Sequence, residues 1–153
     1  MKKFIALFLA VICSITLFVG CANKTKKEQE FYDMVLETQE LLDIVADDIY
    51  DYWYDCIYKD KYREDITYAV SCAKSDNKDN LSKIEENNQR IKELYADLKD
   101  SDLKAEVKAV MQAYNDYYSL VVEVSGSFTT YSANKESYKK ELSSALKDLS
   151  FEL

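Results

Sequence analysis

The sequence predicts an all-α protein: an elongated antiparallel bundle of three long helices, or four if the last one turns, behind an N-terminal lipoprotein signal peptide. Three observations predict this class. The 153 residues contain no proline and only two glycines, so few residues interrupt a helix. Apolar residues recur at alternating spacings of four and three over long stretches, which is the coiled-coil pattern. No segment alternates apolar and polar residues as a half-buried strand would.

The first element is a signal peptide over residues 1–20. A lysine pair is followed by an uncharged, mostly apolar run, and small Gly20 then precedes Cys21. The stretch LFVGC matches a lipobox except at Phe18, where leucine is usual. It predicts cleavage between Gly20 and Cys21 and lipidation of Cys21, which would anchor the chain to the cell membrane on its extracytoplasmic face. The alternatives are an uncleaved anchor helix and an ordinary cleaved signal.

Residues 21–30 are expected to be the lipidated cysteine and a polar tether, and residues 31–153 the extracytoplasmic helical domain. Cleavage would remove two lysines and no acid, so the net charge would change from −8 to −10. This charge argues against nucleic acid and against adsorption onto anionic lipid.

The first helical segment carries a heptad seam that we call the core seam. Its members are Phe31, Val35, Thr38, Leu42, Val45, Ile49, Tyr52 and Cys56. Thr38 is its only polar member, and its methyl group can still pack. The apolar face resumes at Ile66 after a charged stretch, and no glycine or proline lies between, so the helix either continues or kinks there. Residues 74–80, KSDNKDN, are expected to be the first loop.

Two further segments complete the predicted bundle. One helix follows the loop, with Asn88 as a polar interruption of its apolar face, and the register resets around residues 99–102. The last segment keeps one heptad frame from Leu103 to Leu149, broken only at Lys135. The frame passes through Ser125, Gly126 and Ser127, which therefore form either a helix kink or a true turn.

The composition argues against most catalytic chemistry. With no histidine there is no imidazole base and no histidine metal ligand. Two cysteines sixteen residues apart make no zinc site, and the single glycine of the domain allows no phosphate-cradling loop. We therefore expect a non-enzymatic protein without metal or cofactor. Cys56 and Cys72 are expected to be free thiols, with a disulfide as the alternative if the chain turns back between them.

An aromatic-rich stretch, DDIYDYWYDCIYKDKY, spans residues 47–62. At 100° per residue, Trp53 joins the core seam, whereas Tyr50, Tyr54, Tyr58 and Tyr62 follow one another at four-residue spacing. These four tyrosines form a predicted ridge along the helix. The ridge either packs beneath a neighbouring helix with its hydroxyls at the rim, or it is an exposed strip that receives a partner.

Four features resemble small helical lipoproteins of Gram-positive bacteria, some of them prophage-associated: the lipobox, the run WYDCI from Trp53 to Ile57, the segment VSGSFTTYS at 124–132, and the tail rich in lysine, glutamate and tyrosine. The resemblance implies a membrane-tethered extracytoplasmic helical domain and supplies no catalytic residues. The expected function is binding of an envelope protein or peptide through a surface of the bundle. The alternatives are a phage-type superinfection-exclusion lipoprotein and a structural or self-associating spacer.

Overall fold

The computed structural model describes the backbone of residues 2–153 and the side chains of residues 26–153. The predicted signal peptide and the lipidation site at Gly20 and Cys21 lie outside the residues whose side chains are described. The regular structure of the described chain is entirely helical, which confirms the predicted all-α class. Its elements are α1 (Lys2–Tyr58), a short 3-10 helix η1 (Tyr62–Glu64), α2 (Ile66–Asp76), α3 (Lys78–Asp97), α4 (Lys104–Val122) and α5 (Phe128–Ser150).

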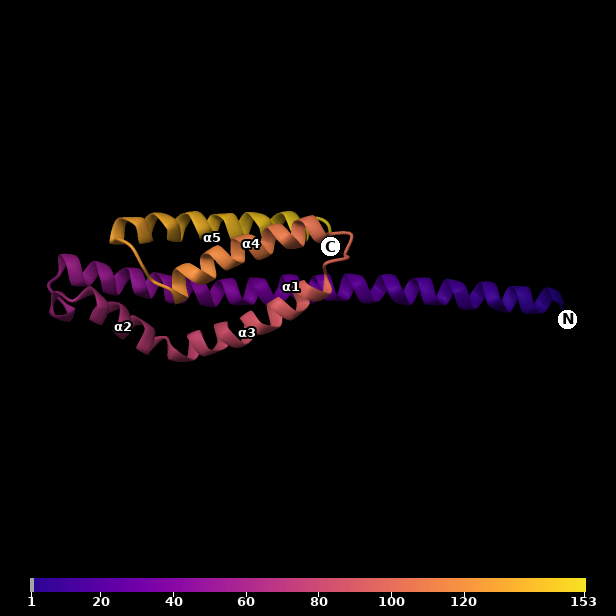
Figure 1. The fold of residues 1–153 in the computed structure, drawn as a ribbon, viewed down its shortest axis with the longest axis horizontal. Helices are drawn as coiled ribbons and strands as arrows, with labels where there is room; N and C mark the ends of the chain where they lie inside the picture. Colours follow the sequence, from indigo (N-terminus) through magenta and orange to yellow (C-terminus); the bar gives the residue numbers. More distant parts are fainter. Residues whose placement is uncertain (1) are drawn as a thin grey trace.

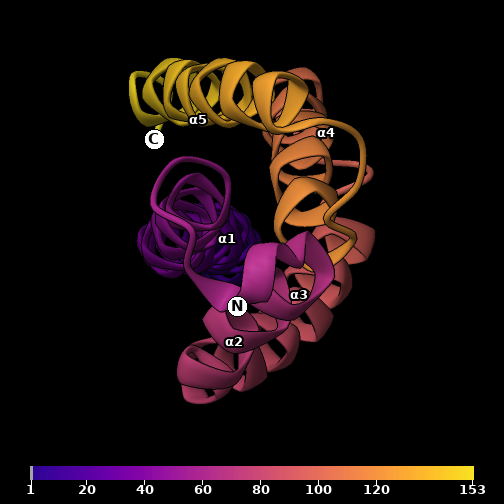
Figure 2. The same ribbon diagram turned by 90° about the vertical axis from the view of Figure 1, so that its left-hand side faces the viewer.

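Helix α1 is the central element of the fold. The other four helices lie beside its C-terminal half, with α2 and α3 on one side and α4 and α5 on the other (Figure 1). Viewed along its length, α2, α3, α4 and α5 form an arc around α1 and leave one side of it uncovered (Figure 2). We call residues 26–153 the helical body, and we call the end with the α1–α2 connection its distal end.

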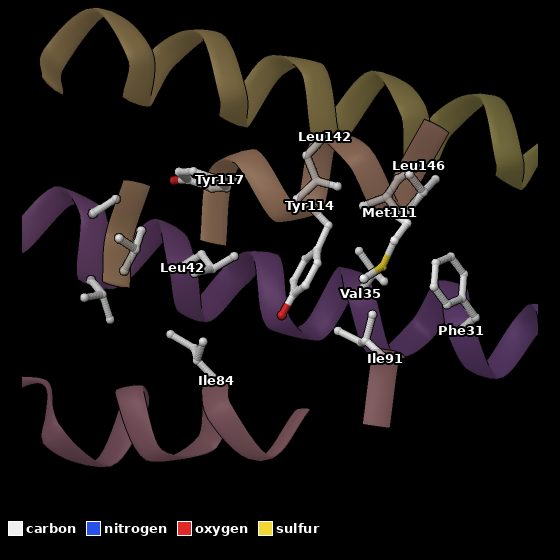
Figure 3. Packing of buried hydrophobic residues seen from close by; sticks show 14 of the residues in the cluster. Phe31, Val35, Leu42, Ile84, Ile91, Met111, Tyr114, Tyr117, Leu142 and Leu146 are labelled. Atoms are coloured by element: carbon white, nitrogen blue, oxygen red, sulfur yellow. The ribbon is translucent and has the colours of Figure 1, made fainter. Parts of the chain in front are cut away.

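The core lies between α1 and this arc. Seven of the eight members of the core seam are buried, and Tyr52 alone is half-buried. Leu142 and Leu146 from α5, and Ile84 and Ile91 from α3, meet the seam from opposite sides (Figure 3). The heptad pattern thus marks a face that packs within one chain, because burying such a stripe is the main source of stability for an amphipathic helix.

Buried polar pairs set the register between the helices. The amide of Asn87 in α3 donates to Thr38 Oγ1 at 3.1 Å, and Thr38 Oγ1 donates to the carbonyl of Met34 at 2.7 Å. Tyr114 reaches from α4 between α1 and α3 (Figure 3), and its hydroxyl donates to Asn88 at 3.3 Å. Both polar exceptions in the sequence pattern, Thr38 and Asn88, are therefore matched by a partner on another helix.

The α1–α2 connection differs from the sequence prediction. The first helix neither continues through the charged stretch nor kinks there; it ends at Tyr58, and the chain turns back on itself. Four consecutive or near-consecutive non-glycine residues adopt positive φ in this turn: Asp60, Tyr62, Arg63 and Glu64. Asp65 then caps α2 by accepting the N–H of Tyr68 at 3.0 Å. A turn that contains neither glycine nor proline is difficult to predict from the sequence.

The predicted loop at 74–80 is also different. It shrinks to Asn77, which is 4% exposed and separates α2 from α3. The Asn77 amide donates to Asp48 on α1 at 2.7 Å and to the carbonyl of Ala73 at 3.1 Å. Its side-chain oxygen accepts from Asn80 at 2.9 Å. A single buried asparagine therefore connects the two helices, and its side chain forms hydrogen bonds at the point where the helix is interrupted.

The α4–α5 connection settles the alternative at residues 125–127 in favour of a turn. Helix α4 ends at Val122, where Lys74 of α2 donates to the last carbonyl at 2.8 Å. Gly126 has φ +87°, a left-handed conformation that excludes it from a helix. Ser127 then caps α5 by accepting the N–H of Thr130 at 3.1 Å. The described chain consequently has five α-helices where three or four were expected.

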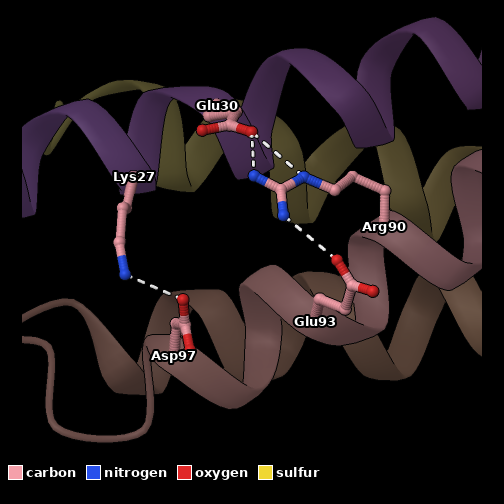
Figure 4. A network of polar contacts seen from close by, with 5 residues as sticks. All are labelled: Lys27, Glu30, Arg90, Glu93 and Asp97. Atoms are coloured by element: carbon pink, nitrogen blue, oxygen red, sulfur yellow. Dashed lines mark hydrogen bonds and ion pairs between the residues drawn. The ribbon is translucent and has the colours of Figure 1, made fainter.

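The described part of the predicted tether is helical and is held against the helical body. Lys27 pairs with Asp97 at 2.8 Å, and Glu30 pairs with Arg90, which also bonds Glu93 at 3.1 Å (Figure 4). Buried Glu28 accepts a hydrogen bond from Ser101 in the α3–α4 connection. The packed unit therefore includes residues 26–30, which the sequence pattern assigned to the tether.

Candidate binding surface

Three of the four predicted ridge tyrosines lie in a row near the end of α1. The ring centroids of Tyr50 and Tyr54 are 6.3 Å apart, and those of Tyr54 and Tyr58 are 4.7 Å apart. Exposure increases along the row: Tyr50 is half-buried, Tyr54 is 38% exposed and Tyr58 is 61% exposed. The row therefore leaves the core gradually and presents its last two rings to solvent.

Phe128 completes this surface. It is the first residue of α5, and its ring lies 5.0 Å from Tyr50, 6.2 Å from Tyr54 and 6.1 Å from Tyr58. The turn at Gly126 and the Ser127 cap place it there. We call Tyr50, Tyr54, Tyr58 and Phe128 the aromatic patch. The sequence placed Phe128 on the heptad frame, but only the turn beside it brings it to the ridge.

Tyr62 does not join the row, contrary to the prediction. Four-residue spacing keeps side chains on one face only while the helix continues, and α1 ends before Tyr62. Tyr62 lies in the turn with φ +56°, and its ring stacks 4.9 Å from that of Tyr52. Tyr52 in turn donates a hydrogen bond to Asp76 of α2. This tyrosine pair stabilises the α1–α2 hairpin and is not part of the aromatic patch.

Trp53 lies directly beneath the patch. Its ring is 6.0 Å from Phe128 and 5.6 Å from Tyr131, and only 4% of the residue is exposed. Its indole Nε1 is buried and has no hydrogen-bond partner within the described chain. Buried donors are normally paired, so an unpaired one below an exposed aromatic surface is an uncommon feature.

Charged groups frame the patch on both sides. On α1, Asp55 holds Lys59 and Lys61, each at 2.6 Å, and the hydrogen bonds from these lysines lower the pKa of the Asp55 carboxyl. Lys59 also lies 5.5 Å above the Tyr54 ring. On α5, Lys135 binds Asp47 at 2.5 Å and lies 4.7 Å from the Tyr50 ring. Lys135, which breaks the heptad frame, therefore tethers α5 to the edge of the patch.

A shallow hollow lies along this edge. It has a volume of about 320 Å³ and is lined by Tyr50, Asp51, Tyr54, Asp55 and Lys59. Its walls combine the aromatic faces and hydroxyls of two tyrosines with two carboxylates and one lysine that is paired with Asp55. Such a mixture suits non-covalent recognition of a peptide or protein side chain, because tyrosine offers apolar area together with a polar tip.

A second, larger hollow lies at the opposite end, where α1 meets the α3–α4 connection. Its volume is about 590 Å³, and Lys27, Glu30, Asp97 and Ser101 are among its lining residues. Lys27 and Asp97 pair with each other, and Glu30 pairs with Arg90 (Figure 4). This hollow is therefore bounded by the contacts that hold the start of the helical body together.

The cysteines of the helical body are free. Cys56 is 3% exposed and Cys72 is partly exposed. Burial raises the pKa of the Cys56 thiol, and the nearby carboxylates of Asp65 and Glu64 add to this. In the part of the chain with described side chains, no three or more cysteine, aspartate or glutamate residues are grouped to hold a metal ion.

The core seam has a bearing on the spacer alternative. Self-association of a long helix through heptads requires an exposed seam, and this one is covered by α2 to α5 of the same chain.

Among the residues searched, no helix is both long and apolar enough to cross a membrane. No protein-family model, curated protein or solved structure matches the chain.

Proposed function

We propose that this protein is an extracytoplasmic lipoprotein, held at the cell membrane by a lipid on Cys21, whose helical body binds an envelope protein or peptide without catalysing a reaction. The lipobox at Leu17–Cys21 supports the membrane tether. The observation that carries the binding role is the aromatic patch. Tyr54 and Tyr58 expose large aromatic faces at the distal end, on a helix that also leads back to Cys21.

The position of the patch suits a tethered binder. From residue 26 to Tyr54, α1 rises about 42 Å at 1.5 Å per residue. The patch therefore lies at the far end of the helical body from the lipid attachment site, where a partner in the envelope has access to it. Rigid aromatic side chains contribute a large share of the binding energy in protein interfaces, because they lose little conformational entropy when they are covered.

Cross-linking in intact cells followed by mass spectrometry tests the proposal. A Tyr54→Ala/Tyr58→Ala variant should lose the specific partner while keeping its membrane level. Phe151→Ala is the matched control, because Phe151 is an exposed aromatic residue (73%) in the turn after α5, away from the patch. The control should retain the partner. Capture of the same proteins by the wild type and the tyrosine variant, or of none by the wild type, would refute binding through the patch.

A further inference from the structure

The uncovered side of α1 is a continuous surface, and the exposed tyrosines of the aromatic patch lie at its C-terminal end. The arc of helices leaves this side free (Figure 2). Exposed residues recur along it at spacings of three and four, apart from one adjacent pair at 36 and 37, and we call them the outward face of α1. They are Asp33, Leu36, Glu37, Glu40, Ile44, Asp47, Asp51, Tyr54 and Tyr58. At 1.5 Å per residue the face is about 38 Å long, which is the length of a seven-turn helix.

The exposed large hydrophobic side chains of the described chain are concentrated on α1. Eight large hydrophobic residues are exposed in the described chain, and five of them belong to this helix. Leu36 is 39% exposed and Ile44 is 49% exposed, and both lie on the outward face. Leu36 also lines a groove of about 320 Å³ between α1 and α5, together with Leu146 of α5. The outward face therefore offers apolar anchor points two helical turns apart, ahead of the aromatic rings.

The part of this helix that carries the outward face has charges of one sign. Between Glu28 and Tyr58 the sequence contains ten acidic residues and no lysine or arginine. Lysines of α5 pair with two of these acids: Lys139 with Asp43 beside the outward face at 2.9 Å, and Lys135 with Asp47 on it. The carboxylates of Asp33, Glu37, Glu40 and Asp51 have no cation within 4 Å in the described chain, and all four residues lie on the outward face.

We propose that the outward face of α1 binds a cationic amphipathic helix of a partner protein, laid along α1 with its apolar stripe on Leu36 and Ile44. This inference deepens the proposed function, because it supplies the chemistry of the partner. A row of like charges on one helix repels itself, and lysines or arginines beside the apolar stripe of a partner would reverse that repulsion. The helix-in-groove mode of recognition uses the same combination of apolar anchors and complementary charge.

Charge also argues against other occupants. A second copy of this chain would bring its own carboxylates against these, and like charges across an interface are strongly unfavourable. A membrane with anionic lipids repels an acidic face in the same way. A basic helix is the occupant that satisfies both the apolar and the charged groups.

The test uses the full lipidated chain in neutral detergent and a labelled synthetic helix of leucine and lysine, with leucines on one face, as the probe. Fluorescence anisotropy measures the dissociation constant at low and high salt. The variant Glu37→Lys/Glu40→Lys/Asp51→Lys should bind the probe at least about tenfold more weakly at low salt and lose most of the salt dependence. Ile44→Ser, which removes an apolar anchor without changing the charge, should also weaken binding, and at both salt concentrations.

The matched control, Asp102→Lys/Asp116→Lys/Asp148→Lys, changes the net charge equally at exposed sites outside α1. It should keep the wild-type affinity within about twofold. Equal losses in both triple variants would show general charge attraction and overturn the inference, as would failure of the wild type to bind. Self-association of the wild type through this face would also overturn it. The tyrosine positions are unchanged in these variants, so failure here leaves the cross-linking test of the patch to be judged separately.

Discussion

Replacement of Thr38 by valine separates what the heptad pattern predicts from what the structure predicts. Valine is nearly isosteric and completes the apolar seam, so the pattern alone predicts a gain of about 0.8 kcal/mol for one more buried methyl group. In the structure, Thr38 Oγ1 is the acceptor for the Asn87 amide, and Asn87 is 2% exposed. Leaving that amide unpaired costs about 1–3 kcal/mol.

The two contributions oppose each other, and the second is larger. We expect Thr38→Val to lower the free energy of unfolding by about 1 kcal/mol. With a urea dependence of about 2 kcal/mol per molar, the unfolding midpoint would fall by about 0.5 M. Urea unfolding of residues 22–153, followed by far-ultraviolet circular dichroism, measures both midpoint and slope.

A double-mutant cycle tests the cause. The double variant Thr38→Val/Asn87→Leu removes both polar partners and should regain at least the wild-type stability, because an apolar pair of similar shape leaves nothing unsatisfied. The Asn87→Leu single variant should lose little, since Thr38 still donates to the Met34 carbonyl. If Thr38→Val alone is as stable as the wild type with an unchanged slope, the Asn87 amide does not depend on this bond and the reasoning is refuted.

Three further predictions use other features. Gly126→Ala should lower stability by about 1 kcal/mol through backbone strain alone, since an added Cβ would lie 3.9 Å from Thr130, and an unchanged urea midpoint would contradict this. Iodoacetamide should alkylate Cys72 at least about tenfold faster than Cys56, because burial raises the Cys56 pKa, whereas equal rates would count against the packing at Cys56. The part of the stability that the buried tyrosines contribute should be fully present below about pH 10 and be lost as the pH rises further, because burial and the Glu85 hydrogen bond raise the pKa of Tyr118 to about 12, and burial also raises those of Tyr114 and Tyr131. Alkaline titration monitored by circular dichroism checks this, and undiminished stability at about pH 12 would disprove it.

Periodicity identified the buried face of α1 because burial follows the geometry of the helix. Phe31, Val35 and Leu42 are in the core for the reason that their spacing indicates. Thr38 and Asn88 looked like flaws in the pattern, because a single sequence cannot show which two polar positions will face each other. Their partners, Asn87 and Tyr114, are 49 and 26 residues away.

The ends of the helices were harder to predict than their faces. The turn after Tyr58 uses ordinary residues such as Tyr62 and Arg63 in left-handed conformations. It is held by the stacking of Tyr62 on Tyr52 of α1 and by the hydrogen bond from Tyr52 to Asp76 of α2, and local sequence patterns show neither contact. The aromatic patch was predicted only in part for the same reason. Tyr54 and Tyr58 follow helical spacing, whereas Phe128 arrives through a turn that the heptad frame does not reveal.

The central position of α1 has a consequence for how the chain acquires its structure. Contacts on one side of α1 are made with α2 and α3, which follow closely, but its contacts with α5 join residues as far apart as Gln39 and Ser143, 104 positions on. During synthesis from the N-terminus, the part of the α1 surface that packs against α5 therefore stays uncovered until this last helix is present. We expect the hairpin of α1 with α2 and α3 to form early and α5 to dock last. The aromatic patch, which needs Phe128 from α5, would then be assembled only in the completed protein.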